Sequence, residues 1–172
     1  YNFWGLWAYY LSSPLNLIIV FFQKDMLNMV LSHLYVIKIA LCCFTAAFYF
    51  YKRRGKETFS MIVFGMAYGF SSYIVGYSWN IMWLEVMILF PIILYGFEKM
   101  MQGKGWKTYC FALFLSLWCN FYMSFMTCLF LVIWFLLYEH QGVKKFFQNG
   151  LRFALFSLLS AAMAAIVLVP AY

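Results

Sequence analysis

Residues 77–85 read Tyr-Ser-Trp-Asn-Ile-Met-Trp-Leu-Glu and join two long apolar runs without a charged spacer. Residues 58–76 before this stretch carry no charge, and residues 81–97 are apolar except at Glu85. Trp and Tyr rings are amphipathic and gather where a membrane meets water. We therefore expect a tight interfacial turn between two membrane helices. An acid about one turn below that interface is expensive, which makes Glu85 a candidate functional residue. An ordinary aromatic belt, with its acid still in reach of water, is the alternative interpretation.

The composition predicts an all-α, polytopic membrane protein. The 172 residues are 67% hydrophobic, 24% aromatic and 10% charged, with a mean hydropathy of +0.84. A soluble domain of this size could not bury that much apolar surface, so the lipid bilayer is the expected partner. The net charge of +7 does not indicate nucleic acid, because so few charges could not cover a groove.

Residues 1–25 are expected to be interfacial helices of an outer loop. Ser13-Pro14 is typical of an N-cap followed by proline at the first helical position, which predicts a short helix there. The apolar run 15–22 is too short to span a bilayer, which takes about 20 residues. Two short helices lying in the interface fit this segment better.

The rest of the chain, residues 26–172, is expected to form a transmembrane bundle of about six helices. Gly65 and Gly69 have the G-x-x-x-G spacing that lets two helices approach closely in lipid. The predicted spans are 26–51, 58–76, 81–97, 108–119, 121–138 and 151–169.

Residues 108–138 allow two interpretations, a single long helix or a hairpin that turns near Asn120. With the hairpin, the loops 52–57, 98–107 and 139–152 share one side and hold ten of the twelve basic residues. With one long helix, the basic residues of the last loop move to the other side. The positive-inside rule therefore favours the hairpin, and it places residues 1–25 and 77–85 on the outer side.

Lys38 lies about 12 residues inside its span. A lysine at that depth costs roughly 2.5–3.5 kcal/mol on insertion scales unless it is paired. Lys38 could hold a lipid-linked phosphate in the outer half of the membrane, or it could pair structurally with Glu85. The two roles are compatible, because a ligand could displace one partner.

Four motifs resemble those of the YfhO family of bacterial membrane proteins. They are Ala-Tyr-Tyr-Leu-Ser-Ser-Pro-Leu-Asn-Leu (8–17), the opening stretch (77–85), Gly-Phe-Glu-Lys (96–99) and Asn-Phe-Tyr (120–122). The similarity extends in order over nearly the whole chain. It implies a GT-C-like helical bundle, that is, a membrane glycosyltransferase that uses a polyprenyl-phosphate sugar at the outer face. It also implies that the chain begins within the first outer loop, so that the principal catalytic acid lies upstream.

The expected activity is therefore transfer of a sugar from a polyprenyl-phosphate donor to a cell-wall polymer such as a teichoic acid, at the extracytoplasmic face of the cell membrane. Glu85 is the candidate catalytic residue, and a divalent metal is left open as a cofactor. A lipid-linked substrate transporter or flippase, or a structural membrane subunit, is the alternative. The candidate substrate-binding residues are Lys38, Tyr9, Tyr10, Tyr77, Trp79, Asn80, Trp83, Asn120 and Tyr122.

Overall fold

A computed structural model describes residues 3, 12–55, 59–77, 79–139 and 142–171, and these residues are helical without strands. Tyr9 and Tyr10 lie outside the described residues. The principal elements are α2 (Leu27–Arg54), α3 (Phe59–Gly69), α4 (Ser72–Gly76), α5 (Leu84–Met101), α6 (Trp106–Cys119), α7 (Phe121–Leu137) and α8 (Val143–Ala171).

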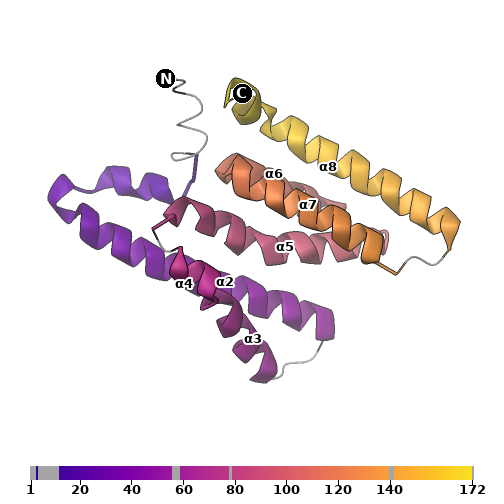
Figure 1. Cartoon of the computed structure of the whole chain (residues 1–172), viewed down its shortest axis with the longest axis horizontal. Helices are drawn as coiled ribbons and strands as arrows, with labels where there is room; N and C mark the ends of the chain where they lie inside the picture. The colour runs from indigo at the N-terminus through magenta and orange to yellow at the C-terminus, as the bar shows by residue number, and fades with distance from the viewer. Residues whose placement is uncertain (1–2, 4–11, 56–58, 78, 140–141, 172) are drawn as a thin grey trace.

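The helices run back and forth between the two ends of the molecule (Figure 1). Helices α2, α5 and α7 run from left to right in this view, whereas α3 with α4, α6 and α8 return. Helix α6 ends at Cys119 and α7 begins at Phe121, with Asn120 in extended backbone between them. The chain thus turns back at Asn120, as the hairpin interpretation requires.

Small residues set the closest helix contacts, because in lipid they allow backbones to approach. A Cβ added at Gly69 would lie 2.2 Å from Cys43 Sγ, and one at Gly65 would lie 2.7 Å from the Cys43 carbonyl oxygen. The G-x-x-x-G pair of α3 therefore packs directly on α2. Gly96 plays the same part between α5 and α6, where an added Cβ would lie 2.5 Å from the Tyr109 backbone nitrogen.

Two apolar clusters hold the bundle together. The larger one joins α5, α6, α7 and α8 around fully buried Phe97 and Tyr109. The second joins α2, α4 and α5 around Cys42 and Ile74. The first turns of α5 therefore lie where the two halves of the bundle meet, and this position matters for the site described below.

Several element boundaries differ from those predicted. The span expected over 58–76 is interrupted, because Ser71 adopts extended backbone (φ −59°, ψ 148°) and separates α3 from α4. The last helix begins at Val143 rather than at 151, so most of the loop expected over 139–152 belongs to this helix. In the N-terminal segment the short helices are 3₁₀ helices, Asn16–Phe21 and Lys24–Met26.

Four stretches are long and apolar enough to cross a membrane: Lys24–Arg54, Phe59–Gly76, Ile81–Met101 and Val143–Val169. Helix α7 is a shorter apolar helix of 17 residues, and α6 has 14. At 1.5 Å per residue these two helices measure about 26 and 21 Å, which is less than the roughly 30 Å of a bilayer's hydrocarbon core. The tip of the α6–α7 hairpin therefore stops short of the full thickness.

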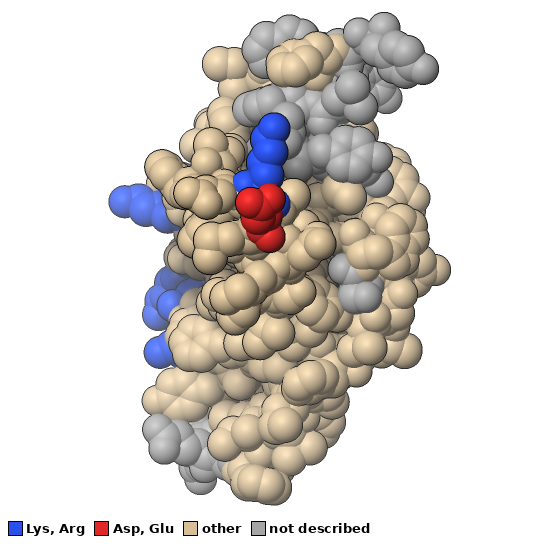
Figure 2. Space-filling model, turned by 90° about the vertical axis from the view of Figure 1, so that its left-hand side faces the viewer, with Lys and Arg blue, Asp and Glu red and all other residues tan. Residues whose placement is uncertain are grey.

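Basic residues gather at one end of the bundle. Helix α2 ends with Lys52, Arg53 and Arg54 before Gly55, which caps it in the left-handed conformation (φ 68°). Other basic residues of this end lie in the last turn of α5, the α5–α6 connection, the first turn of α6 and the first three turns of α8: Lys99, Lys104, Lys107, Lys144, Lys145 and Arg152. The opposite end, which faces the viewer in Figure 2, is mostly uncharged. We refer to these as the basic end and the outer end.

Candidate functional site

The site is built around an ion pair between Lys38 of α2 and Glu85 in the first turn of α5. Lys38 Nζ lies 2.6 Å from Glu85 Oε1. The side chains are 0% and 4% exposed, respectively. The pairing that the sequence analysis considered for these two residues is therefore present.

Two further acceptors surround the Lys38 ammonium. It donates to Asn16 Oδ1 at 2.6 Å and to the Ile81 backbone oxygen at 2.9 Å. An ammonium group has three N–H donors, so Glu85, Asn16 and Ile81 account for all of them. The lysine is thus fully satisfied in this conformation.

The Glu85 carboxylate is satisfied on one side. Its Oε1 accepts from both Lys38 Nζ and the Ser13 hydroxyl. Its Oε2 is buried and has no hydrogen-bond partner among the described residues. The same holds for Nδ2 of Asn80, which is 4% exposed. Because buried polar atoms are normally paired, each of these two atoms could accept or donate one more hydrogen bond to a ligand or water.

The segment Ser12–Asn16 closes the site from the outer end. The Ser12 hydroxyl donates to the Cys119 backbone oxygen (3.0 Å) at the end of α6. Ser13 Oγ accepts from the Asn16 backbone nitrogen (3.1 Å). The 3₁₀ helix begins at Asn16 with Leu15 at its N-cap, so Ser13 is not the N-cap that the sequence predicted. This short segment therefore bridges α2, α5 and α6 through polar side chains.

Helix geometry places the ion pair toward the outer end of the candidate membrane spans. Sixteen residues separate Lys38 from the end of α2 at Arg54, and sixteen separate Glu85 from the end of α5 at Met101. Each charge is therefore about 24 Å from the basic end, level with the tip of the α6–α7 hairpin. Because this hairpin is short, it does not cover the outer side of the ion pair. The Ser12–Asn16 segment covers that side instead.

A cavity of about 130 Å³ adjoins the carboxylate. Glu85 lines it together with Pro14, Leu15 and Cys119. Leu15 and Pro14 belong to the segment that closes the site, so a movement of this segment would widen the cavity toward the outer end.

A second depression, which we call the outer aromatic groove, lies nearby and measures about 400 Å³. It is lined by Tyr73, Tyr77, Trp83, Met87, Tyr122, Met123 and Met126. The Trp83 ring lies 6.1 Å from that of Tyr77 and 6.2 Å from that of Tyr122, between centroids. Trp83 is two residues from Ile81, whose carbonyl accepts from Lys38, so the groove and the ion pair are connected through the 3₁₀ helix Ile81–Trp83 that precedes α5.

The predicted site residues thus divide into two groups. Tyr77, Trp83 and Tyr122 meet in the outer aromatic groove, whereas Lys38 and Glu85 are enclosed beside it. Trp79 is 73% exposed and contacts Tyr77 at 6.3 Å between ring centroids, outside the groove lining.

Asn120 has a structural contact that the sequence analysis did not foresee. It is fully buried, and its side-chain oxygen accepts from the Met123 backbone nitrogen at 3.0 Å. It therefore caps the start of α7.

Sequence reasoning missed Ser12, Ser13 and Asn16 as members of the site. Their signal was present, because three polar residues interrupt an otherwise apolar stretch that precedes a helix. That pattern was interpreted as capping alone. As for metals, the described residues contain no group of three or more His, Cys, Asp and Glu side chains that could hold an ion.

These features define an all-α, polytopic membrane protein with an enclosed ion pair near its outer end. The chain belongs to the YfhO family: the family model described as bacterial membrane protein YfhO matches residues 1–172. The resemblance stated from the sequence motifs is thereby confirmed. No curated protein and no solved structure matches the chain.

Proposed function

We propose that this chain is part of a GT-C-type membrane glycosyltransferase, which transfers a sugar from a polyprenyl-phosphate carrier to an extracytoplasmic acceptor such as a teichoic acid. The observation that carries the proposal is the Lys38–Glu85 pair, enclosed about 24 Å from the basic end and next to an open aromatic groove. Charged residues at such depth usually serve a function.

The groove suits an amphiphilic donor. Its aromatic and methionine walls match a prenyl chain or the apolar face of a sugar ring. Its opening near the start of α5 would bring a phosphate linked to that chain toward Lys38. The positive-inside rule assigns the basic end to the cytoplasm, so this groove would face the outer leaflet.

In this proposal Lys38 stabilises the negative charge that develops on the departing phosphate. The ammonium is saturated by Glu85, Asn16 and Ile81, so a phosphate must replace at least one of these acceptors. Displacement of the Ser12–Asn16 segment removes the Asn16 contact and exposes the pair. Glu85 then assists removal of the proton from the acceptor's hydroxyl group, through its second oxygen.

The experiment compares sugar transfer by the full-length protein and by variants that keep the fold. We expect Glu85→Gln to reduce transfer of a radiolabelled polyprenyl-phosphate sugar strongly, because an amide neither accepts a proton nor balances Lys38. Glu98→Gln is the matched control: it lies on the same helix at the basic end, where its carboxylate accepts from Tyr49. Transfer by this control should be unchanged.

The double variant Lys38→Met with Glu85→Leu separates a catalytic from a structural role. Replacing a buried ion pair by apolar residues often preserves or raises stability, so this variant should fold. A folded double variant without transfer supports the proposal. Normal transfer by the folded double variant would refute it, and movement of the lipid-linked sugar across vesicles without transfer would favour a flippase instead.

A further inference from the structure

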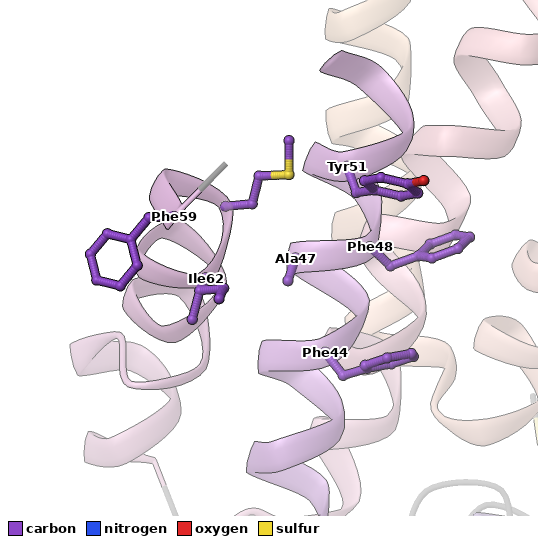
Figure 3. A pocket seen from close by; sticks show the side chains of 7 residues that line it. Phe44, Ala47, Phe48, Tyr51, Phe59 and Ile62 are labelled. Carbon is purple, nitrogen blue, oxygen red and sulfur yellow. The ribbon is translucent and has the colours of Figure 1, made fainter. Parts of the chain in front are cut away.

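An apolar groove lies between α2 and α3 on the side of the bundle away from α6–α8 (Figures 1 and 3). It measures about 480 Å³ and is lined by Phe44, Phe48 and Tyr51 of α2 and by Phe59 and Ile62 of α3. Phe44, Phe59 and Ile62 are 67%, 78% and 56% exposed, so its walls face the surroundings of the bundle. We call this the α2–α3 groove.

The helix contact explains why the groove exists. Gly65 and Gly69 bring α3 against Cys43 and Ala47 at one end. One turn further toward the basic end, the α3 residues that line the groove are the larger Met61 and Ile62. Ala47 lies between the two walls in Figure 3, so the floor of the groove is shallow and apolar.

A cation lies beside two of the aromatic rings that line the groove. Lys52 Nζ lies 5.5 Å from the ring centroid of Phe48 and 5.3 Å from that of Tyr51, and both rings line the groove. These distances are within the range of cation–π attraction, which holds the ammonium at the groove rather than away from it. An anion drawn to Lys52 would therefore lie next to residues that line the apolar groove.

The length of the groove along α2 is similar to the thickness of the hydrocarbon part of one lipid leaflet. Eight residues separate Phe44 from Lys52, which corresponds to about 12 Å along the helix, and half of a hydrocarbon core is about 15 Å. From this match of length, apolarity and charge we propose that the α2–α3 groove binds an anionic glycerophospholipid. One acyl chain lies along the groove, and the phosphate lies beside the Lys52 ammonium. This site is at the opposite end from the proposed catalytic site and does not depend on it.

Native mass spectrometry of the full-length protein tests this site, with phosphatidylglycerol and phosphatidylcholine offered in equal amounts. We expect one phosphatidylglycerol to be retained in preference to phosphatidylcholine. Lys52→Gln should lower this preference about fivefold, as expected for one basic residue near an anionic head group. Lys52→Arg should preserve it. The matched control is Lys99→Gln, whose ammonium lies 4.6 Å from the Tyr95 ring at the same end but outside the groove.

Filling the groove tests the position of the acyl chain. Ile62→Trp should reduce retention of both lipids, whereas Val63→Trp, at the next position of α3 and 46% exposed, should not. The proposal is overturned if Lys52→Gln and Lys99→Gln have equal effects, or if Ile62→Trp retains lipid like the wild type. It is also overturned if the spectra show a dimer that Ile62→Trp abolishes, because a second copy of the chain would then occupy the groove.

Discussion

Breaking the Lys38–Glu85 pair on one side should destabilise the protein far more than removing it entirely. Lys38→Met leaves the Glu85 carboxylate charged and buried, and it removes the donor from Asn16 Oδ1 and the Ile81 carbonyl. Removing one partner of a buried pair typically costs about 3–5 kcal/mol. We expect a loss of this size for Lys38→Met and again for Glu85→Leu, which strands the ammonium.

The double variant should lose much less. Lys38→Met with Glu85→Leu leaves only neutral groups without partners, the Asn16 amide, the Ile81 carbonyl and the Ser13 hydroxyl. Because the cost of burying two charges is removed as well, we expect a net loss of about 1–3 kcal/mol. The two single losses sum to roughly 6–10 kcal/mol, so the coupling energy between the two positions is at least about 3 kcal/mol.

The wild type, the two single variants and the double variant form a double-mutant cycle. Their free energies of unfolding can be measured by reversible unfolding in mixed detergent micelles, followed by intrinsic fluorescence. The Arg53–Glu98 pair supplies a control cycle, because its atoms are 3.7 Å apart and Arg53 is 52% exposed. That pair should couple by less than about 1 kcal/mol. Additive losses at Lys38 and Glu85, within about 0.5 kcal/mol, would show that the two charges do not depend on each other and would refute the reasoning.

Three further predictions concern helix contacts and the outer aromatic groove. Gly96→Val should destabilise the protein by about 1–3 kcal/mol in the same unfolding assay, because its Cβ would meet the backbone of Tyr109. Gly76→Ala is the control and should be tolerated, since the space around its Cβ is open. Asn120→Ala should cost about 1 kcal/mol through loss of the α7 cap, and an equal loss in Asn120→Ser, which keeps a neutral capping oxygen, would argue against the capping role. Trp83→Ala should raise the KM for the polyprenyl-phosphate sugar with unchanged stability; an unaltered KM would separate the outer aromatic groove from donor binding.

The site depends on helix lengths that do not match. Helices α2 and α5 extend beyond the tip of the α6–α7 hairpin, so their outer turns carry a surface that α6 and α7 do not cover. The Ser12–Asn16 segment occupies that place with hydrogen bonds to Cys119, Glu85 and Lys38. A segment held by a few side-chain contacts is more easily displaced than a packed helix, which is what entry of a lipid-linked ligand would need.

Local patterns were sufficient to predict much of this protein. Hydropathy predicted the membrane class, Gly65 and Gly69 predicted a close helix contact, and the distribution of lysine and arginine favoured a turn at Asn120. Each of these patterns can be recognised in single segments of the chain. The reason is that each membrane helix meets the lipid separately and that charged residues avoid the hydrocarbon core. The depth of Lys38 and Glu85 along their helices could likewise be counted from the sequence.

The tertiary structure alone decided which atoms meet. Ser13 and Glu85 are 72 positions apart, and Lys38 and Ile81 are 43 apart, so no local pattern relates them. Their contact follows from the rotation of α2 and α5 about their axes, which is set where the two helices pack together around Cys42, Leu84 and Ile88. Hydropathy limits how deep a residue lies, but side-chain packing determines the direction in which it points, and the ion pair requires both.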